Sequence, residues 1–291
     1  MKMRSVGVDG HQVSAVGFGG MPLSIQGRPD ESQAVRVIHS ALDAGMTLID
    51  TADVYCLDHE DIGHNERLVA KALAAWTGDS DRIVVATKGG LERPDGRWTR
   101  NGRPEHLQAA VDASLAALGV ERIDLYQLHA PDPDVAFEES VGALAALRSE
   151  GKIDKVGLSN VSVEEIRSAE AIVLVASVQN RLNPFFREAV DTGVVDYCGE
   201  NGIAFLAYSP VGGGRLNKKL PDHETVSSIA DRYGVSPHAV VLAWVLAKGP
   251  SVIIIPGARS VEHVLDSASA AEIELTPDDI LAIDSAQFST A

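Results

Sequence analysis

Several features are scarce in this sequence of 291 residues, and each absence excludes a class of protein. Two cysteines, Cys56 and Cys198, are too few for the disulfide framework of a small secreted domain, so we expect two reduced thiols. No apolar run reaches the roughly 18 to 20 residues that cross a bilayer. Residues 1–4 lead into glycine and polar residues rather than into the apolar core of a signal peptide. We therefore expect a cytoplasmic protein that does not bind membranes.

Basic residues are also in short supply. The sequence contains 25 Lys and Arg residues and 41 Asp and Glu residues, which gives a net charge of -16. This charge disfavours nucleic acid as a partner, and a phosphate-bearing ligand would need a local basic or backbone site. The sequence has no Pro/Ser-rich linker and no low-complexity stretch, which predicts a single domain over residues 1–291.

Helical and strand-like segments alternate regularly along the chain. Asp30 and Gln33 are spaced as a capping pair in front of one helix, and Gly45 is placed to end that helix in a left-handed conformation. Pro104 stands in the first turn of another predicted helix, which Gly119 ends. The alternation predicts repeated β-α units.

Eight apolar segments have the character of buried strands. Because they are apolar almost throughout, we expect both faces to be covered, as in a parallel sheet with helical crossovers. Eight such strands predict an α/β fold of the (β/α)8 TIM barrel type, with extra helices near the C-terminus; an open doubly wound sheet is the alternative. The segments lie near residues 16–18, 46–50, 83–88, 123–128, 156–158, 176–178, 203–207 and 252–255.

Residues 16–20 (Val-Gly-Phe-Gly-Gly) look like the start of a dinucleotide-binding fingerprint. That fingerprint requires a helix to begin at once, whereas Pro22 and a loop to Asp30 follow here. We interpret these glycines as a tight turn at the mouth of the barrel.

Titratable residues stand at the ends of three successive predicted strands. Asp50, Lys88 and His129 each end a strand, and Tyr55 lies in the loop after the first of them. Catalytic groups of such barrels lie at the C-terminal edge of the strands. One such residue alone is usually structural or solvated, but four at one rim predict an active site.

The chemistry of these four residues predicts their roles. A tyrosine has a pKa of about 10, and the ammonium group of Lys88 would lower the pKa of Tyr55. Asp50 would keep Lys88 charged, and His129 would donate a hydrogen bond to a carbonyl oxygen. The pattern contains no nucleophilic serine and no metal-binding cluster, so the missing reagent is a hydride, which only a cofactor supplies. The sequence predicts hydride transfer between a nicotinamide cofactor and a carbonyl/alcohol pair.

The remaining strand ends offer places for that cofactor. Amide and hydroxyl side chains suit the nicotinamide carboxamide, and an aromatic ring offers a face for stacking on the nicotinamide. Glycine backbone and the N-terminus of a helix suit phosphates, although a triple glycine is equally typical of a flexible surface loop. These candidates are Ser159, Asn160 and Gln179, then Tyr208, then Gly212, Gly213 and Gly214, and finally the Gly257–Ser260 segment.

In combination these residues resemble the aldo-keto reductase family. Residues 50–55 (Asp-Thr-Ala-Asp-Val-Tyr) and 63–66 (Gly-His-Asn-Glu) resemble the first signature of that family. Later motifs follow in the family's order over nearly the whole chain, and the general pattern resembles a bacterial branch of pyridoxal reductases and potassium-channel β-like reductases. The later motifs are Lys88, His129, residues 157–160, residues 178–180 and residues 255–259.

The resemblance implies a catalytic tetrad of Asp50, Tyr55, Lys88 and His129, with NADPH extended across the barrel mouth. It implies that Tyr208 stacks on the nicotinamide ring. Ser159, Asn160 and Gln179 would hold the carboxamide, Ser209, Pro210, Gly212, Gly213, Gly214 and Leu216 would face the pyrophosphate, and Gly257 and Arg259 would lie near the adenosine 2′-phosphate. At the adenosine end this chain has His263, Asp266 and Ser267 where the family often has Arg or Gln and then Glu-Asn, which leaves the strength of the NADPH preference open.

A basic loop follows Lys88, with Arg93, Arg97, Trp98, Arg100 and Arg103 close together. The loop is either a solvated surface or a rim that binds an aromatic or anionic carbonyl substrate, such as pyridoxal, through Trp98.

The leading hypothesis is therefore an NADPH-dependent carbonyl reductase that is a monomer or a weak homo-oligomer. An NADPH-binding regulatory subunit with little turnover is the alternative. A Schiff-base aldolase would need a neutral Lys88, and Asp50 opposes that state.

Overall fold

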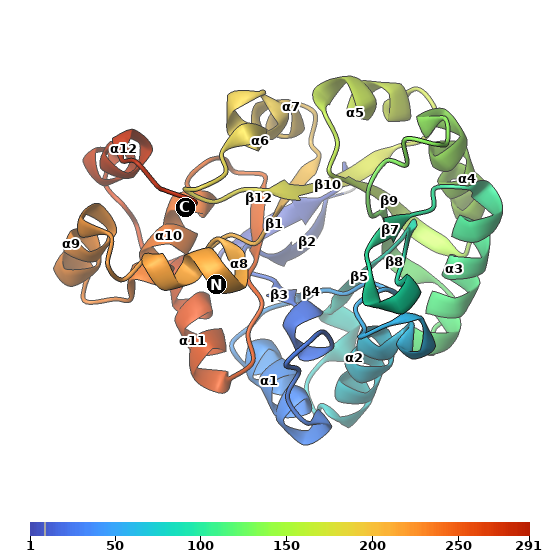
Figure 1. Cartoon of the computed structure of the whole chain (residues 1–291), viewed down its shortest axis with the longest axis horizontal. Helices are drawn as coiled ribbons and strands as arrows, with labels where there is room; N and C mark the ends of the chain where they lie inside the picture. The colour runs from blue at the N-terminus through green and yellow to red at the C-terminus, as the bar shows by residue number, and fades with distance from the viewer. Residues whose placement is uncertain (9) are drawn as a thin grey trace.

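The computed structural model describes residues 1–8 and 10–291, and its centre is an eight-stranded parallel sheet. Bridges from Val16 to Ile254 and from Gly19 to Gly257 join the first strand region to the last, so the sheet closes into the ring seen in Figure 1. The predicted (β/α)8 barrel is confirmed. Its strands, in order around the barrel, are β3 (Phe18–Gly19), β4 (Leu48–Asp50), β5 (Val84–Gly89), β8 (Ile123–Leu128), β9 (Ile153–Ser159), β10 (Val175–Arg181), β11 (Ala204–Tyr208) and β12 (Val252–Ile255).

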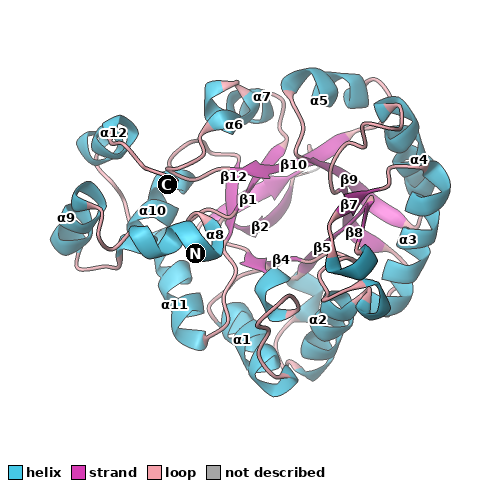
Figure 2. Ribbon diagram, viewed as in Figure 1, coloured by secondary structure: helices cyan, strands magenta, loops and turns pink. Residues whose placement is uncertain are grey.

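Helices surround the barrel (Figure 2). Two of them, α9 (Glu224–Tyr233) and α12 (Pro277–Ser285), pack on each other outside the ring and are the extra helices predicted near the C-terminus. Within the described residues, no helix has the length and apolar character that a membrane crossing requires. The other helices are α1 (Glu31–Asp43), α2 (His64–Ala75), α3 (Pro104–Leu118), α4 (Phe137–Ser149), α5 (Val163–Glu170), α6 (Glu188–Asp191), α7 (Val194–Glu200), α8 (Gly213–Leu216), α10 (Pro237–Leu246) and α11 (Val261–Ser269).

Local signals in the sequence explain where the first helices begin and end. Asp30 caps α1 by accepting a hydrogen bond from the Gln33 backbone N–H at 2.8 Å. The Gln33 side chain donates instead to the carbonyl of Arg259, so only half of the predicted capping pair forms. Gly45 and Gly119 have φ of 86° and 70°, the left-handed conformations predicted at these two helix ends.

A β-hairpin that the sequence pattern did not predict closes one end of the barrel. It consists of β1 (Met3–Val6) and β2 (His11–Ser14), which pair antiparallel. Val6 and Val13 pack into the cluster of side chains that fills the barrel interior, together with residues that begin strands, such as Leu48 and Val84. The hairpin therefore covers the N-terminal ends of the strands and leaves the C-terminal ends as the open rim.

The glycines at positions 17, 19 and 20 bring backbones together where the barrel closes. Gly19 donates its N–H to the carbonyl of Pro256 at 3.0 Å, and a Cβ on Gly19 would lie 2.7 Å from the Ile255 carbonyl oxygen. A Cβ on Gly20 would lie 2.4 Å from Oδ1 of Asn65. A single 3-10 turn follows, and α1 begins only at Glu31. This agrees with the interpretation of these glycines as a turn at the barrel mouth rather than a dinucleotide fingerprint.

Candidate active site

The predicted catalytic residues lie at the C-terminal rim of the barrel. Asp50 is the last residue of β4, Lys88 lies near the end of β5, and His129 directly follows β8. Strands β4, β5 and β8 are neighbours in the sheet, and parallel strands end at the same edge. Asp50 and Lys88 are almost completely buried, with exposed fractions of 3% for Asp50 and 0% for Lys88.

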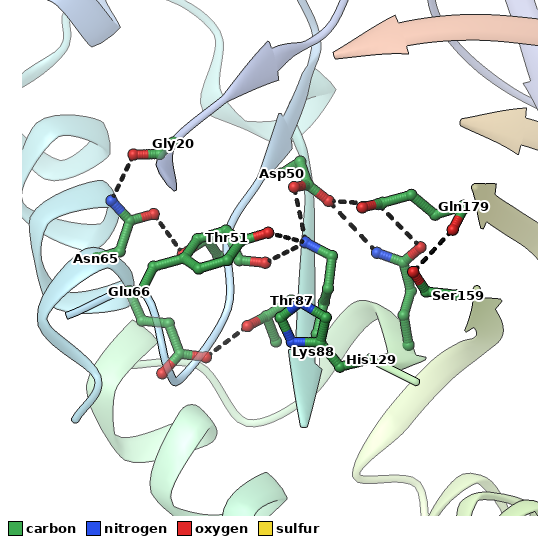
Figure 3. A network of polar contacts seen from close by, with 12 residues as sticks. Gly20, Asp50, Thr51, Asn65, Glu66, Thr87, Lys88, His129, Ser159 and Gln179 are labelled. Carbon is green, nitrogen blue, oxygen red and sulfur yellow. Dashed lines mark hydrogen bonds and ion pairs between the residues drawn. The ribbon is translucent and has the colours of Figure 1, made fainter. Parts of the chain in front are cut away.

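Lys88 is the centre of a buried hydrogen-bonding cluster (Figure 3). Its Nζ donates to Oδ2 of Asp50 at 2.7 Å, to the Thr51 carbonyl at 2.8 Å and to the Tyr55 hydroxyl at 3.0 Å. These three acceptors match the three hydrogens of an ammonium group. Burial lowers the pKa of Lys88, and the Asp50 carboxylate opposes that shift. The structure therefore brings Asp50, Lys88 and Tyr55 into direct contact.

The acidity of Tyr55 differs in sign from our expectation. Burial raises the pKa of the Tyr55 hydroxyl well above its usual value, and the Asp50 carboxylate raises it further. We expected Lys88 to lower this pKa; that expectation neglected the removal of the phenol from water and the neighbouring negative charges. The hydroxyl stays protonated at neutral pH and is a proton donor rather than a base.

Three rings lie together beside the lysine cluster. The ring centroid of Tyr55 is 5.8 Å from that of His129 and 6.5 Å from that of Trp98, and all three rings meet edge to face. Burial, with a smaller effect from Lys88, lowers the pKa of His129 well below its usual value, so the imidazole is neutral at pH 7. Its Nδ1 is buried without a hydrogen-bond partner. A neutral imidazole can donate one hydrogen bond to an oxygen near Tyr55.

The second carboxylate oxygen of Asp50 is held by two glutamines. Gln179 donates from Nε2 to Oδ1 of Asp50 at 2.7 Å, and Gln127 donates to the same atom at 3.5 Å. Sequence reasoning missed Gln127, although a glutamine in an otherwise apolar strand is a usable signal; in the sheet it pairs with Lys88. Ser159 donates its hydroxyl to the Gln179 carbonyl at 2.7 Å. Gln179 is thus engaged with Asp50 as well as being a candidate for the cofactor carboxamide.

Asn160 connects neighbouring strand ends across the rim. Its Nδ2 donates to the His129 carbonyl at 3.0 Å, and its Oδ1 accepts from the Tyr208 hydroxyl at 2.8 Å. Asn160 and Ser209 have φ of 60° and 48°, in the left-handed region that non-glycine residues rarely adopt. Such strained residues concentrate at functional sites, and these two directly follow β9 and β11.

The triple glycine is part of an ordered turn rather than a featureless loop. It follows Pro210, and the first two glycines, Gly212 and Gly213, have φ of 91° and 70°. A Cβ on Gly212 would lie 2.8 Å from Cβ of Leu216, which is itself buried. A Cβ on Gly214 would meet nothing within 4 Å. The first two glycines are therefore required by the turn, and the third leaves open space beside it.

Arg259 ties the loop in front of α1 to the end of β12. Its Nε donates to the Pro22 carbonyl at 2.9 Å, and Nη2 donates to the Gln26 carbonyl at 2.8 Å. A Cβ on Gly257 would lie 2.6 Å from the ring of Pro22, so this glycine permits the same close approach. The predicted contact of Arg259 with a phosphate stays a prediction.

The predicted adenosine-end residues lie on α11. Ser260 caps this helix by accepting from the His263 N–H at 3.4 Å. Asp266 accepts from the Ser236 hydroxyl at 2.7 Å, and Ser267 is half-buried. Asp266 is therefore engaged with the N-terminus of α10.

Two buried acids behind Lys88 also escaped the sequence reasoning, although both belong to the quoted motifs. Asp53 donates its backbone N–H to the Lys88 carbonyl, and Glu66 accepts from the Thr87 hydroxyl at 2.6 Å. Burial raises the pKa of both carboxyl groups, and for Asp53 the neighbouring Glu66 adds to the effect. With Asp50 they place three carboxyl groups around one ammonium.

Comparisons with known proteins show the family to which this chain is similar. The model of the Aldo/keto reductase family matches residues 15–287. An uncharacterized oxidoreductase of Schizosaccharomyces pombe is 35% identical over 271 residues, which are 91% of this chain and 84% of that protein.

Two solved structures are similar over nearly the whole chain. A glycerol dehydrogenase from Gluconobacter oxydans is 32% identical with a TM-score of 0.83, and the match covers 97% of this chain and 93% of that one. An aldo/keto reductase from Klebsiella pneumoniae in complex with NADP and acetate is 26% identical with a TM-score of 0.81, and the match covers 98% and 95% of the two chains.

Proposed function

This chain belongs to the aldo/keto reductase family, and on that basis we propose that it reduces an aldehyde or ketone to an alcohol with NADPH. The main support is the buried cluster in which Lys88 donates to both Asp50 and Tyr55. A carbonyl oxygen that gains negative charge needs a proton, and Tyr55 holds one at neutral pH. A screen of carbonyl compounds that follows NADPH absorbance tests the proposal directly.

Each residue of the cluster has a distinct task in this mechanism. Tyr55 donates the proton to the substrate oxygen, and Lys88 orients the Tyr55 hydroxyl. Asp50 keeps Lys88 in its ammonium form, and the neutral His129 donates a hydrogen bond to the same substrate oxygen. Because all three Nζ hydrogens of Lys88 already have acceptors, the lysine is poorly suited to form a Schiff base.

NADPH supplies the hydride when bound, and residues at the neighbouring strand ends fit it. The ring of Tyr208, held by Asn160, is available for stacking on the nicotinamide, and Ser159 and Gln179 stand beside it on β9 and β10. The bound NADP of the Klebsiella relative supports this assignment. The pyrophosphate would meet the turn formed by Ser209, Pro210, Gly212, Gly213, Gly214 and Leu216, and the adenosine end would meet Gly257, Arg259, His263, Asp266 and Ser267.

Cofactor preference gives a test of Arg259. One charge-assisted hydrogen bond to the 2′-phosphate contributes about 1.5 to 3 kcal/mol, so NADPH should bind roughly tenfold or more tightly than NADH. The Arg259→Ala variant should lose this preference. Fluorescence titration of both cofactors measures it, and NADH is the internal control, because loosening of the Pro22–Gln26 loop would weaken both cofactors alike. Equal affinities in the wild type would refute the assignment.

For the substrate we propose an aldehyde with an aromatic ring, such as pyridoxal. Trp98 lies beside Tyr55 and His129, and 47% of the residue is exposed. The guanidinium of Arg93 lies 4.0 Å from the centre of the Trp98 ring and holds the indole in place. A ring-bearing substrate at Tyr55 would pack against this indole.

The Trp98→Ala variant should raise the Michaelis constant for ring-bearing aldehydes roughly two- to tenfold, from an aromatic contact of about 0.5–1.5 kcal/mol. Steady-state kinetics on pyridoxal and benzaldehyde measure the effect, with propanal as the aliphatic control and NADPH affinity unchanged. An unaltered Michaelis constant across the panel would make the loop merely a solvated surface. Absence of pyridoxal turnover in the wild type would exclude pyridoxal as a substrate.

A further inference from the structure

A buried glutamine, Gln127, connects the lysine cluster to Gln179. Its exposed fraction is 0%, and in the sheet it pairs with Lys88 on one side and with Gly157 on the other. Its Nε2 donates to Oδ1 of Asp50 at 3.5 Å, and its Oε1 accepts from Nε2 of Gln179 at 3.2 Å. One amide side chain therefore contacts both an acid of the catalytic cluster and a candidate for the cofactor carboxamide.

The side-chain amide of Gln179 has one orientation that suits these neighbours. An ionised carboxylate can only accept hydrogen bonds, so the NH2 group of Gln179 must face Asp50, and it donates to Oδ1 at 2.7 Å (Figure 3). The second hydrogen of this NH2 group goes to Oε1 of Gln127. A single hydrogen bond would leave the amide free to turn about that bond, whereas two fix its plane. Gln127 therefore sets the direction in which Oε1 of Gln179 points.

The Oε1 atom of Gln179 is the acceptor that these contacts leave free. Both hydrogens of the NH2 group are used inside the barrel, so Gln179 cannot donate to a ligand without breaking one of these contacts. No residue that the structure describes donates to Oε1, and the surface of this atom is accessible to solvent. The ligand group that suits Gln179 is therefore an N–H donor, such as the NH2 group of the nicotinamide carboxamide.

The space for the Gln127 side chain exists because Gly157 has no side chain of its own. A Cβ on Gly157 would overlap Oγ of Ser177 and would lie 2.7 Å from Cγ of Gln127. The φ of Gly157 is not positive, so this glycine is needed for space rather than for its backbone conformation. Gly157 and Gln127 therefore form one arrangement.

We propose that Gln127 is a positioning residue for the nicotinamide cofactor and that Gly157 makes room for it. Gln127 fixes the amide of Gln179, and Oε1 of Gln179 then accepts from the carboxamide NH2 group. This contact restricts the orientation of the nicotinamide ring. The inference rests on the proposed function, because it requires a cofactor that carries a carboxamide.

The binding of two oxidised cofactors tests this role without any turnover. The 3-acetylpyridine analogue of NADP+ has a methyl group in place of the carboxamide NH2 group, so it cannot donate the hydrogen bond to Gln179. Isothermal titration calorimetry gives the ratio of the two affinities, and the wild type should prefer NADP+. Gln127→Met keeps an unbranched side chain of similar length and should reduce this preference about two- to tenfold, which is the contribution of one hydrogen bond.

Ser177→Ala is the matched control. Ser177 is fully buried beside Gly157 and its hydroxyl has no hydrogen-bond partner, so this variant should keep the wild-type preference. Gly157→Ala should lower the preference in the same direction as Gln127→Met, because the added methyl group displaces Gln127. It replaces Gln127→Met if the latter unfolds.

An unchanged preference in Gln127→Met would overturn the proposal, even if both cofactors bound more weakly, because a merely structural role would weaken both alike. Equal affinities of the wild type for NADP+ and the analogue would also overturn it, since the NH2 group would then not be recognised. If the wild type bound neither cofactor, the proposed function itself would be wrong, and this inference with it.

Discussion

Replacement of Tyr55 by phenylalanine is expected to lower turnover about 10²–10⁴-fold, which is the usual contribution of a positioned general acid. The hydroxyl is the one atom that this change removes, and it is the group that Lys88 contacts at 3.0 Å. The ring remains and keeps its edge-to-face contacts with Trp98 and His129, so packing and NADPH binding should survive. Single-turnover hydride transfer measures the loss, and NADPH fluorescence measures binding.

Tyr126→Phe is a matched control for this experiment. Tyr126 is fully buried in β8, and its hydroxyl has no hydrogen-bond partner, so removal of that hydroxyl should leave turnover unchanged. If Tyr55→Phe reduced aldehydes at nearly the wild-type rate, the assigned proton donor would be wrong. If the wild type bound NADPH tightly but turned over no carbonyl compound in a broad panel, the hypothesis of an NADPH-binding regulatory subunit would replace that of a carbonyl reductase.

Lys88→Met is expected to abolish most activity and also to destabilise the protein. Methionine keeps an unbranched side chain of similar length, but Asp50 then remains buried without its cation. Breaking a buried ion pair typically costs about 3–5 kcal/mol of the free energy of unfolding. We expect a loss near the lower end of this range, because Gln179 and Gln127 still donate hydrogen bonds to Asp50. Without Lys88, the negative charge of Asp50 also raises the pKa of Tyr55 further.

The double variant Asp50→Asn, Lys88→Met separates these two effects. It removes the unpaired charge, so urea unfolding should show that much of the lost free energy of unfolding is regained. Single-turnover hydride transfer should stay low, because nothing orients Tyr55. A double variant that regained both stability and turnover would show that Lys88 has only a structural role. A fully active Lys88→Met variant would contradict the mechanism.

Most of the barrel could be predicted from local patterns. Each of the eight strands contains an apolar stretch of a few residues, because strand positions that are covered on both faces of the sheet favour apolar side chains. Residues that end such segments in a parallel sheet share one rim, so residue order alone places Asp50, Lys88 and His129 together. Gly45 and Gly119 carried enough information to end their helices.

The hairpin β1–β2 shows where local patterns stop being informative. Its four-residue strands alternate only briefly between exposed and buried residues, and its closing role depends on contacts of Val6 and Val13 with strands far along the chain. The role of Gln127 is likewise not evident from the sequence alone. It depends on a hydrogen bond to Asp50, which lies 77 residues away in the sequence.

The sequence by itself determined the barrel and the rim at which the reactive side chains meet, because the order of apolar and polar residues predicts which segments are buried strands and where each strand ends. The motifs at that rim also indicated the family. Only the tertiary structure decided the state of those side chains. The pKa of Tyr55 is raised rather than lowered because it depends on how much water the fold excludes and on which charges the fold brings near.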